Sequence, residues 1–149
     1  MKSLSFVVLG APVAQPRVKA QGVLSKSGRV YAHVYEPGRK DSPARQWKSD
    51  VKQAALLADG LGNLWEGPIA LAVDFFLPRP ANRCRKKDPA ESIPCLTKPD
   101  LDNLIKAVKD ALSGVIYRDD KQIWQETVRK RYHEIGGRPR AEIYLEELA

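Results

Sequence analysis

Apolar positions recur at three- and four-residue spacings between Asp100 and Asp119. This period predicts an amphipathic helix with one buried stripe. The stripe comprises Leu101, Leu104, Ile105, Val108, Ala111, Leu112 and Val115. Pro99 disfavours a helical conformation at Lys98, and glycine commonly ends helices, so we expect the helix to start directly after Pro99 and to stop at Gly114.

A second helix is predicted from Ser42 to about Gly60. Serine is a good N-cap, and proline is favoured at the first helical position, which Pro43 occupies. Trp47 falls on the apolar positions of this segment, so its spacing favours a place in the core over stacking on a nucleic-acid base.

Strands are predicted where β-forming residues are bounded by turn residues. These segments are 4–9, 69–77, 123–132 and 141–146, and alternation within 29–35 predicts a further strand or hairpin arm. The nearly unbroken apolar run 69–77 is typical of a central strand covered on both faces, although Asp74 interrupts it. The order of elements predicts an α+β fold, with a mixed β-sheet and two main helices in a single domain, 1–149.

The 149 residues carry a formal net charge of +7, and the pI is near 9.5. This balance favours an anionic partner such as nucleic acid, although many soluble proteins are also basic. Cys84 and Cys95 lack further ligands at zinc spacing, which favours free thiols in a reducing cytoplasm. No apolar run reaches membrane-spanning length, and the short run 4–9 is better explained as a strand than as a signal peptide.

Four acids flank the predicted helix 100–113: Asp100 and Asp102 at its start, Asp119 and Asp120 in the loop after it. Each acid by itself has a structural explanation as an N-cap, a helix-dipole partner, a turn residue or an ion-pair partner of Lys106. Clustered carboxylates, however, repel one another unless a cation lies among them. A small set of oxygen ligands suits Mg²⁺ or Mn²⁺, provided that the chain doubles back to bring Asp120 to the helix start.

Two further features bear on this candidate site. Lys106 lies one helical turn beyond Asp102, where its ammonium could meet a phosphate. Asp74 is either paired with a neighbouring donor or an additional carboxylate near the site. An EF-hand loop starting at Asp100 is excluded, because its sixth and twelfth positions hold Ile105 and Ala111 in place of glycine and glutamate.

The run 98–112 (KPDLDNLIKAVKDAL), followed by 118–123 (RDDKQI), resembles the signature of the RusA-type Holliday junction resolvases. The resemblance implies a RusA-like fold and a Mg²⁺-dependent endodeoxyribonuclease, with Mn²⁺ as an alternative metal. It implies a homodimer that resolves four-way DNA junctions by paired phosphodiester hydrolysis, in recombination and repair. It also implies that Asp100, Asp102 and Asp120 bind the metal and that Lys106 is essential, whereas the role of Asp119 stays open.

The DNA-binding residues are expected in two basic segments and beside the acids. The irregular stretch 78–97 is long enough to be either a functional loop or a mobile, solvated one, and it carries Arg79, Arg83, Arg85, Lys86 and Lys87. Among the cations of the chain we select Arg17, Lys19, Arg83, Arg85, Lys86, Lys87 and Lys98 as the candidates for contact with DNA.

Other functions stay open from the sequence alone. A nuclease for other branched or flapped DNA would use the same residues. A restriction-type nuclease core is less consistent, because its second acid and lysine would lie on a strand and not on a helix. A catalytically inactive DNA-binding protein, or a basic interaction module without a DNA role, would keep the acids only for folding.

Overall fold

The computed structural model describes residues 1–16, 19–35, 42–60 and 62–149, with the backbone alone for 19–21, 23 and 31–35. Its main body is a five-stranded mixed sheet in the order β1-β7-β4-β6-β5. The strands are β1 (Lys2–Leu9), β4 (Ile69–Leu77), β5 (Ile93–Pro94), β6 (Ile123–Tyr132) and β7 (Arg140–Glu147). Only β4 and β6 pair in parallel; the other neighbours are antiparallel.

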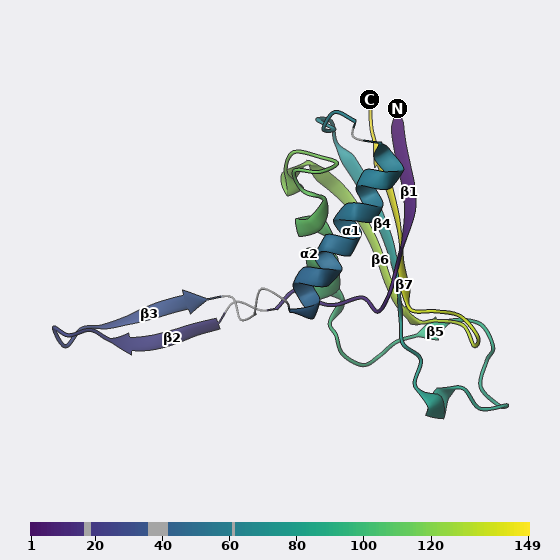
Figure 1. Cartoon of the computed structure of the whole chain (residues 1–149), viewed down its shortest axis with the longest axis horizontal. Coiled ribbons are helices and arrows are strands. Elements are labelled where there is room, and N and C mark those ends of the chain that lie inside the picture. The colour runs from purple at the N-terminus through teal and green to yellow at the C-terminus, as the bar shows by residue number, and fades with distance from the viewer. Residues whose placement is uncertain (17–18, 36–41, 61) are drawn as a thin grey trace.

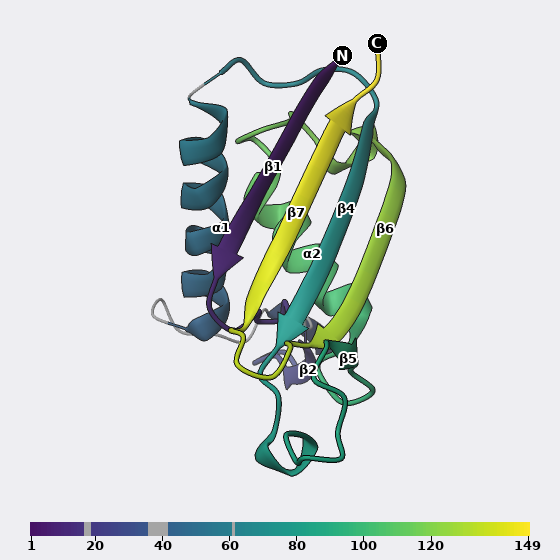
Figure 2. The same ribbon diagram turned by 90° about the vertical axis from the view of Figure 1, so that its right-hand side faces the viewer.

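Both helices pack on one face of this sheet, and Figure 2 views the opposite face. They are α1 (Pro43–Asp59) and α2 (Leu101–Leu112). Ser42 caps α1 by accepting a hydrogen bond from the amide of Arg45, and Trp47 is buried in the core. The α+β class, the mixed sheet, the two helices and the core position of Trp47 are therefore confirmed.

Strand β4 is central, as predicted, but the expectation that both its faces are covered is wrong. Ile69, Leu71, Val73 and Phe75 are buried against the helices, whereas the alternate residues Ala70, Ala72 and Asp74 are half-buried on the other face. Because Ala70 and Ala72 are small, they tolerate a partly open face at little cost in exposed apolar area. A continuous apolar run therefore does not require a second covering layer here.

Helix α2 connects the two parallel strands. The chain leaves β4, forms a short 3₁₀ turn (η1, Ala81–Arg83) and the short strand β5, and then enters α2. After α2 and a second 3₁₀ turn (η2, Asp120–Gln122), β6 returns beside the helix. Gly114, just past the helix, has φ +76°, a left-handed conformation that glycine adopts without steric cost. The chain therefore doubles back next to α2, as a shared acidic site requires.

A separate two-stranded sheet, β2 (Lys19–Leu24) and β3 (Val30–Tyr35), forms the predicted hairpin arm. Figure 1 shows the arm extending away from the main body. Two hydrogen bonds close the turn at its tip: the amide of Ser25 donates to the carbonyl of Arg29, and the Ser25 hydroxyl accepts from the Arg29 amide. Among the helices that the structure describes, none is long and apolar enough to cross a membrane.

Candidate active site along helix α2

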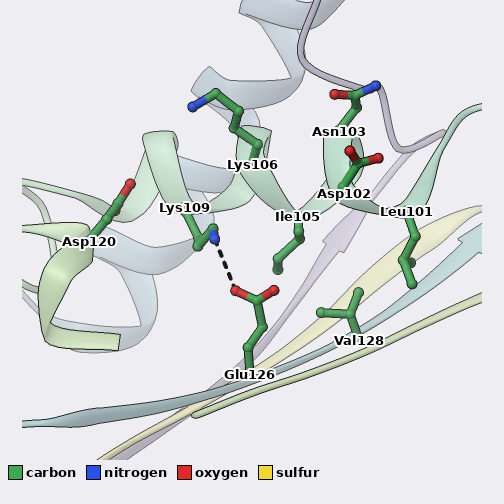
Figure 3. Close-up of a pocket in the computed structure, with 9 residues that line it drawn as sticks. All are labelled: Leu101, Asp102, Asn103, Ile105, Lys106, Lys109, Asp120, Glu126 and Val128. Carbon is green, nitrogen blue, oxygen red and sulfur yellow. Dashed lines mark ion pairs between the residues drawn. The ribbon is translucent and has the colours of Figure 1, made fainter. Parts of the chain in front are cut away.

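An open cavity of about 650 Å³ lies between the exposed face of α2 and strand β6 (Figure 3). Its lining is Leu101, Asp102, Asn103, Ile105, Lys106, Lys109, Asp120, Glu126 and Val128. The structure therefore brings three of the candidate site residues, Asp102, Lys106 and Asp120, onto one pocket. The fourth, Asp100, lines an adjoining cavity together with Lys98, Pro99 and Asn103.

The start of α2 presents its acids without using them as caps. Asp100 occupies the N-cap position with φ −71° and ψ 144°, and its carbonyl accepts from the Leu104 amide at 3.2 Å. Among the described residues, however, the Asp100 side chain accepts no capping hydrogen bond. Asp102 lies exposed in the first turn, and within the described ranges no ion pair joins Lys106 to Asp102 or to Asp110. Within the described ranges, Asp100 is therefore not a side-chain cap of α2, and Lys106 is not a helical ion-pair partner of Asp102 or Asp110.

The chain segment that enters α2 is held in place by hydrogen bonds from neighbouring elements. The Lys130 ammonium, on β6, donates to the carbonyls of Thr97 at 2.6 Å and Pro99 at 2.9 Å. The Thr97 hydroxyl lies 2.9 Å from the Tyr132 hydroxyl. The backbone amide of Gln15 donates to the carbonyl of Asn103 at 2.9 Å, which attaches the segment before the arm to the first turn of α2.

Asp120 is positioned by a buried tyrosine that the sequence analysis did not identify. The Tyr117 hydroxyl lies 3.2 Å from Asp120 Oδ1 and 3.1 Å from the carbonyl oxygen of Lys109, and these two acceptors share its one proton. Burial, and then the neighbouring Asp120 charge, raise the pKa of Tyr117. The hydroxyl therefore stays protonated and donates to Asp120, which lies at the edge of the pocket in Figure 3.

The two members of the Asp119-Asp120 pair have different roles. The Asp119 side chain accepts from the Lys121 amide at 3.0 Å, and the Gln122 side chain accepts from the Asp119 amide at 2.9 Å. This reciprocal arrangement caps the η2 turn. Asp119 is thus occupied by local structure, and Asp120 is the member that faces the pocket.

Asp102 and Asp120 lie at opposite ends of the pocket in Figure 3. Asp120 is tied through Tyr117 to Lys109, and Lys109 is seven residues along α2 from Asp102, which corresponds to roughly 10 Å of helix rise. In the part of the chain that the structure describes, no three His, Cys, Asp or Glu side chains lie close enough to hold a metal ion. The chain therefore does not gather Asp100, Asp102 and Asp120 at the start of α2.

Glu126 and Lys109 also line the pocket, and the sequence analysis missed both. Lys109 Nζ lies 3.0 Å from Glu126 Oε2, and this ion pair bridges α2 and β6 (Figure 3). The sequence signal that could have found Glu126 is alternation in β6, where Glu126 precedes Val128 and Lys130 on the helix-facing side. Glu126 nevertheless stays exposed at the mouth of the pocket, where Lys109 pairs with it.

The donor set of the pocket suits a hard divalent cation. Mg²⁺ keeps several waters and is commonly held by one or two carboxylates together with substrate phosphate, so it does not require a closed protein cage. Asp102 and Asp120, with the amide of Asn103, supply oxygen donors of this kind. The residues present therefore fit a cation that is completed by substrate, although they do not form a preassembled cluster.

Asp74 is not part of this site. It lies on the sheet face opposite the helices, and Arg129 pairs with both of its oxygens, Nε to Oδ1 at 2.7 Å and Nη2 to Oδ2 at 3.1 Å. The expectation of a neighbouring donor is confirmed, and the alternative that Asp74 is an extra carboxylate near the site is wrong. The reason is the strand pleat, which directs Asp74 away from Val73 and Phe75.

The candidate DNA-binding residues divide by exposure. Five cations near the end of β4 or the start of α2 are exposed: Arg83, Arg85, Lys86, Lys87 and Lys98. Arg85 is partly engaged, because its Nε lies 3.4 Å from Asp88 Oδ2. Arg79, in contrast, is buried. Arg17 lies outside the described residues, and Lys19 begins β2 with only its backbone described.

An open groove that carries both carboxylates and lysines suits a phosphodiester substrate, whose charge requires cations and whose hydrolysis is promoted by metal-held carboxylates. The fold and this groove point to a nuclease. Comparison with known families finds that the model of "Endodeoxyribonuclease RusA" matches residues 10–146. The chain belongs to the RusA endodeoxyribonuclease family, whose members are nucleases of the Holliday junction resolvase type.

Among curated proteins, the chain is similar to the "Uncharacterized protein YqaN" of Bacillus subtilis (strain 168). The two are 34% identical over 156 aligned residues, which cover 100% of this chain and 99% of the relative. The similarity extends over the whole of this chain but assigns no activity of its own.

Proposed function

We propose that this protein is a divalent-metal-dependent endonuclease that cuts four-way DNA junctions as a homodimer. The observation that carries the proposal is an open pocket lined by Asp102, Lys106 and Asp120, in a chain that matches the RusA family over residues 10–146. A nuclease for other branched or flapped DNA would use the same chemistry. The preference for a four-way junction is therefore tested by comparing DNA substrates.

Each residue of the pocket has a role in phosphodiester hydrolysis. The acids Asp100, Asp102 and Asp120 would hold one or two Mg²⁺ or Mn²⁺ ions, which would supply an activated water and charge neutralisation at the phosphate. Lys106 is exposed one helical turn beyond Asp102, and its ammonium stabilises negative charge that develops on the phosphate oxygens. Tyr117 keeps the Asp120 carboxylate in a fixed orientation.

The partner chemistry follows from the charge. The cations of the loop after β4 are exposed, and Lys98 lines the cavity that adjoins the pocket, so these residues are the candidates for contact with a polyanionic strand. A second copy of the chain would present an equivalent pocket, and a two-fold pair of sites matches the two equivalent strands of a four-way junction.

The proposal is tested with a labelled synthetic four-way junction, incubated with and without Mg²⁺, beside linear duplex and flap controls. We expect paired nicks in the junction that need the metal and that are absent or much slower in the linear duplex. Equal cutting in excess EDTA would overturn the metal mechanism. Junction binding without any cutting would identify an inactive DNA-binding protein, and faster cutting of the flap would replace the junction as substrate.

A further inference from the structure

The loop from Pro78 to Ser92, between β4 and β5, is built around a buried arginine. Only 8% of Arg79 is exposed, whereas arginine is ordinarily an exposed residue unless its charge is compensated. Loops of this length without regular structure are uncommon in compact domains and are typically either functional or disordered. The buried guanidinium in this loop therefore needs an explanation.

Arg79 binds the loop's own backbone at three points. Its Nε donates to the carbonyl of Arg83 at 2.7 Å, its Nη2 to the carbonyl of Pro89 at 2.7 Å, and its Nη1 to the carbonyl of Glu91 at 2.9 Å. These carbonyls come from both the outgoing and the returning limb of the loop. One side chain thus holds the two limbs together.

This arrangement depends on the shape of the guanidinium. Arginine presents its N–H donors in a rigid planar fork, so three acceptors in different directions can be satisfied at once. A lysine has a compact ammonium on a flexible stem and cannot reproduce that geometry. The carbonyl dipoles solvate the buried positive charge, which would otherwise oppose burial.

Further hydrogen bonds fix the remainder of the loop. The Asp88 carboxylate accepts from the Arg85 amide at 2.7 Å, and that hydrogen bond lowers the pKa of Asp88. On the returning limb, the carbonyl of Ala90 accepts from the Ile135 amide at 2.9 Å, and the Ser92 hydroxyl from Arg131 at 3.3 Å. The loop is thus attached both to itself and to the segments around β6.

The loop thus has one buried cation, Arg79, which binds backbone carbonyls, and exposed cations that face solvent. We infer that Arg79 is a positioning residue that holds the loop in one preformed shape, so that Arg83, Lys86 and Lys87 meet the sugar-phosphate backbone of a DNA arm without prior ordering of the loop. Binding by a preordered surface avoids the conformational entropy that a mobile loop loses on binding. This inference rests on the proposed function, because it takes DNA as the partner.

The test compares Arg79→Lys with Lys86→Gln in the full-length protein. Two quantities are measured: amide hydrogen exchange in residues 83–91, and affinity for a four-way junction in EDTA over a range of salt concentrations. Arg79→Lys keeps the net charge, so a loss of affinity in this variant reports loop order and not charge. Lys86→Gln removes an exposed cation but leaves the hydrogen bonds of Arg79 intact.

We expect Arg79→Lys to accelerate exchange in 83–91 with little change in α2, and to weaken junction binding by about tenfold through the added ordering cost. Lys86→Gln should leave exchange unchanged and lower the slope of log K against log salt by about 0.9. Arg79→Gln should weaken binding at least as much as Arg79→Lys. Exchange in α2 that rises together with the loop would indicate general destabilisation and would contradict the inference.

Two other outcomes also overturn it. Unchanged exchange in Arg79→Lys would mean that the guanidinium does not order the loop. Accelerated exchange with unchanged affinity would mean that loop order does not matter for DNA. If the proposed function is wrong, the wild-type protein will not bind the junction. The hydrogen-exchange data would still decide whether Arg79 orders the loop.

Discussion

Asp102 and Asp120 reach the same pocket by different structural means. Asp102 projects from the first turn of α2 and is exposed, so its position follows directly from the helix. Asp120 lies in the turn after the helix and is oriented by the Tyr117 hydroxyl. Substitutions at these two positions therefore test whether the carboxylates act in cleavage or only stabilise the fold.

The first prediction concerns Asp102→Asn. The substitution keeps the size of the side chain and the helix-compatible chemistry, and it removes one negative charge next to the expected position of the phosphate. Cleavage of junction DNA should collapse, while junction binding without metal should hold or tighten. The same outcome is expected for Asp100→Asn and Asp120→Asn, whereas Lys106→Ala should impair cleavage without the gain in binding. Melting temperature, junction affinity and nicking rate are measured in parallel.

Asp119→Asn is the matched control for this series, because Asp119 neighbours Asp120 but caps the η2 turn. Asparagine caps nearly as well as aspartate, so this variant should cleave at close to the wild-type rate. If the asparagine variants of the three proposed metal ligands also cleave normally, these acids have only a structural role. Parallel loss of melting temperature, binding and cleavage would likewise contradict the prediction, since the substitutions would then act through the fold.

The second prediction tests Tyr117 as the residue that orients Asp120. Tyr117→Phe keeps the buried ring but removes the donor to Asp120 Oδ1 and to the Lys109 carbonyl. The loss of a buried hydrogen bond costs about 1 kcal/mol of stability, so the protein should stay folded. The nicking rate should fall by about tenfold, because Asp120 is no longer fixed at the pocket. A wild-type rate in this variant, measured at saturating Mg²⁺, would show that Asp120 needs no such positioning.

At the scale of elements, the site depends on the loop before α2 as much as on α2 itself. Lys130 holds the segment from Thr97 to Pro99 through two carbonyls, and Arg79 binds three carbonyls of the loop between β4 and β5. These cations stabilise backbone and are not available to DNA. The exposed cations of the same stretch are the ones that a phosphate backbone can reach.

The third prediction follows from that division. Combined neutralisation of Arg83, Arg85, Lys86 and Lys87 to glutamine should flatten the salt dependence of junction binding, because each lost phosphate contact lowers the slope by about 0.9. Arg85 is partly paired with Asp88, so it should contribute less than the other three. Affinity is measured in EDTA at several salt concentrations. An unchanged slope would mean that the loop does not touch DNA.

At the scale of the whole molecule, one chain presents one pocket along α2, whereas a four-way junction presents two equivalent strands for cleavage. The hairpin arm β2–β3 extends well beyond the main body (Figure 1), and a sheet of only two strands is marginally stable by itself. Both features are more readily explained for a chain that works with a partner than for an isolated monomer.

The fourth prediction is therefore a two-fold dimer in solution. Light scattering at micromolar concentration should give about twice the mass of the chain, and the dimer should nick both opposed strands of one junction. Wild-type protein mixed with an excess of Asp102→Asn should then cut mainly one strand per junction. A monomer that stays fully active on junctions would contradict this prediction.

Much of the architecture could be predicted from the sequence because local signals specify it. The apolar stripe between Pro99 and Gly114 predicted α2 with its start and end, since both bounding residues act on their immediate backbone. Ser42 and Pro43 marked the start of α1 in the same way. Asp100, Asp102 and Lys106 could be identified as candidate site residues because they lie close together in sequence at the start of one predicted helix.

Only the tertiary structure decided where those residues lie relative to the rest of the chain. The expectation that Asp120 reaches the helix start failed at the last step, because Tyr117 holds it beside Lys109. Asp74 faces away from the site because the helices cover only one side of the sheet, which no strand pattern reveals. Arg79 reads in sequence like every other cation of its loop, and its burial is set by carbonyls four to twelve residues away that meet it only after folding.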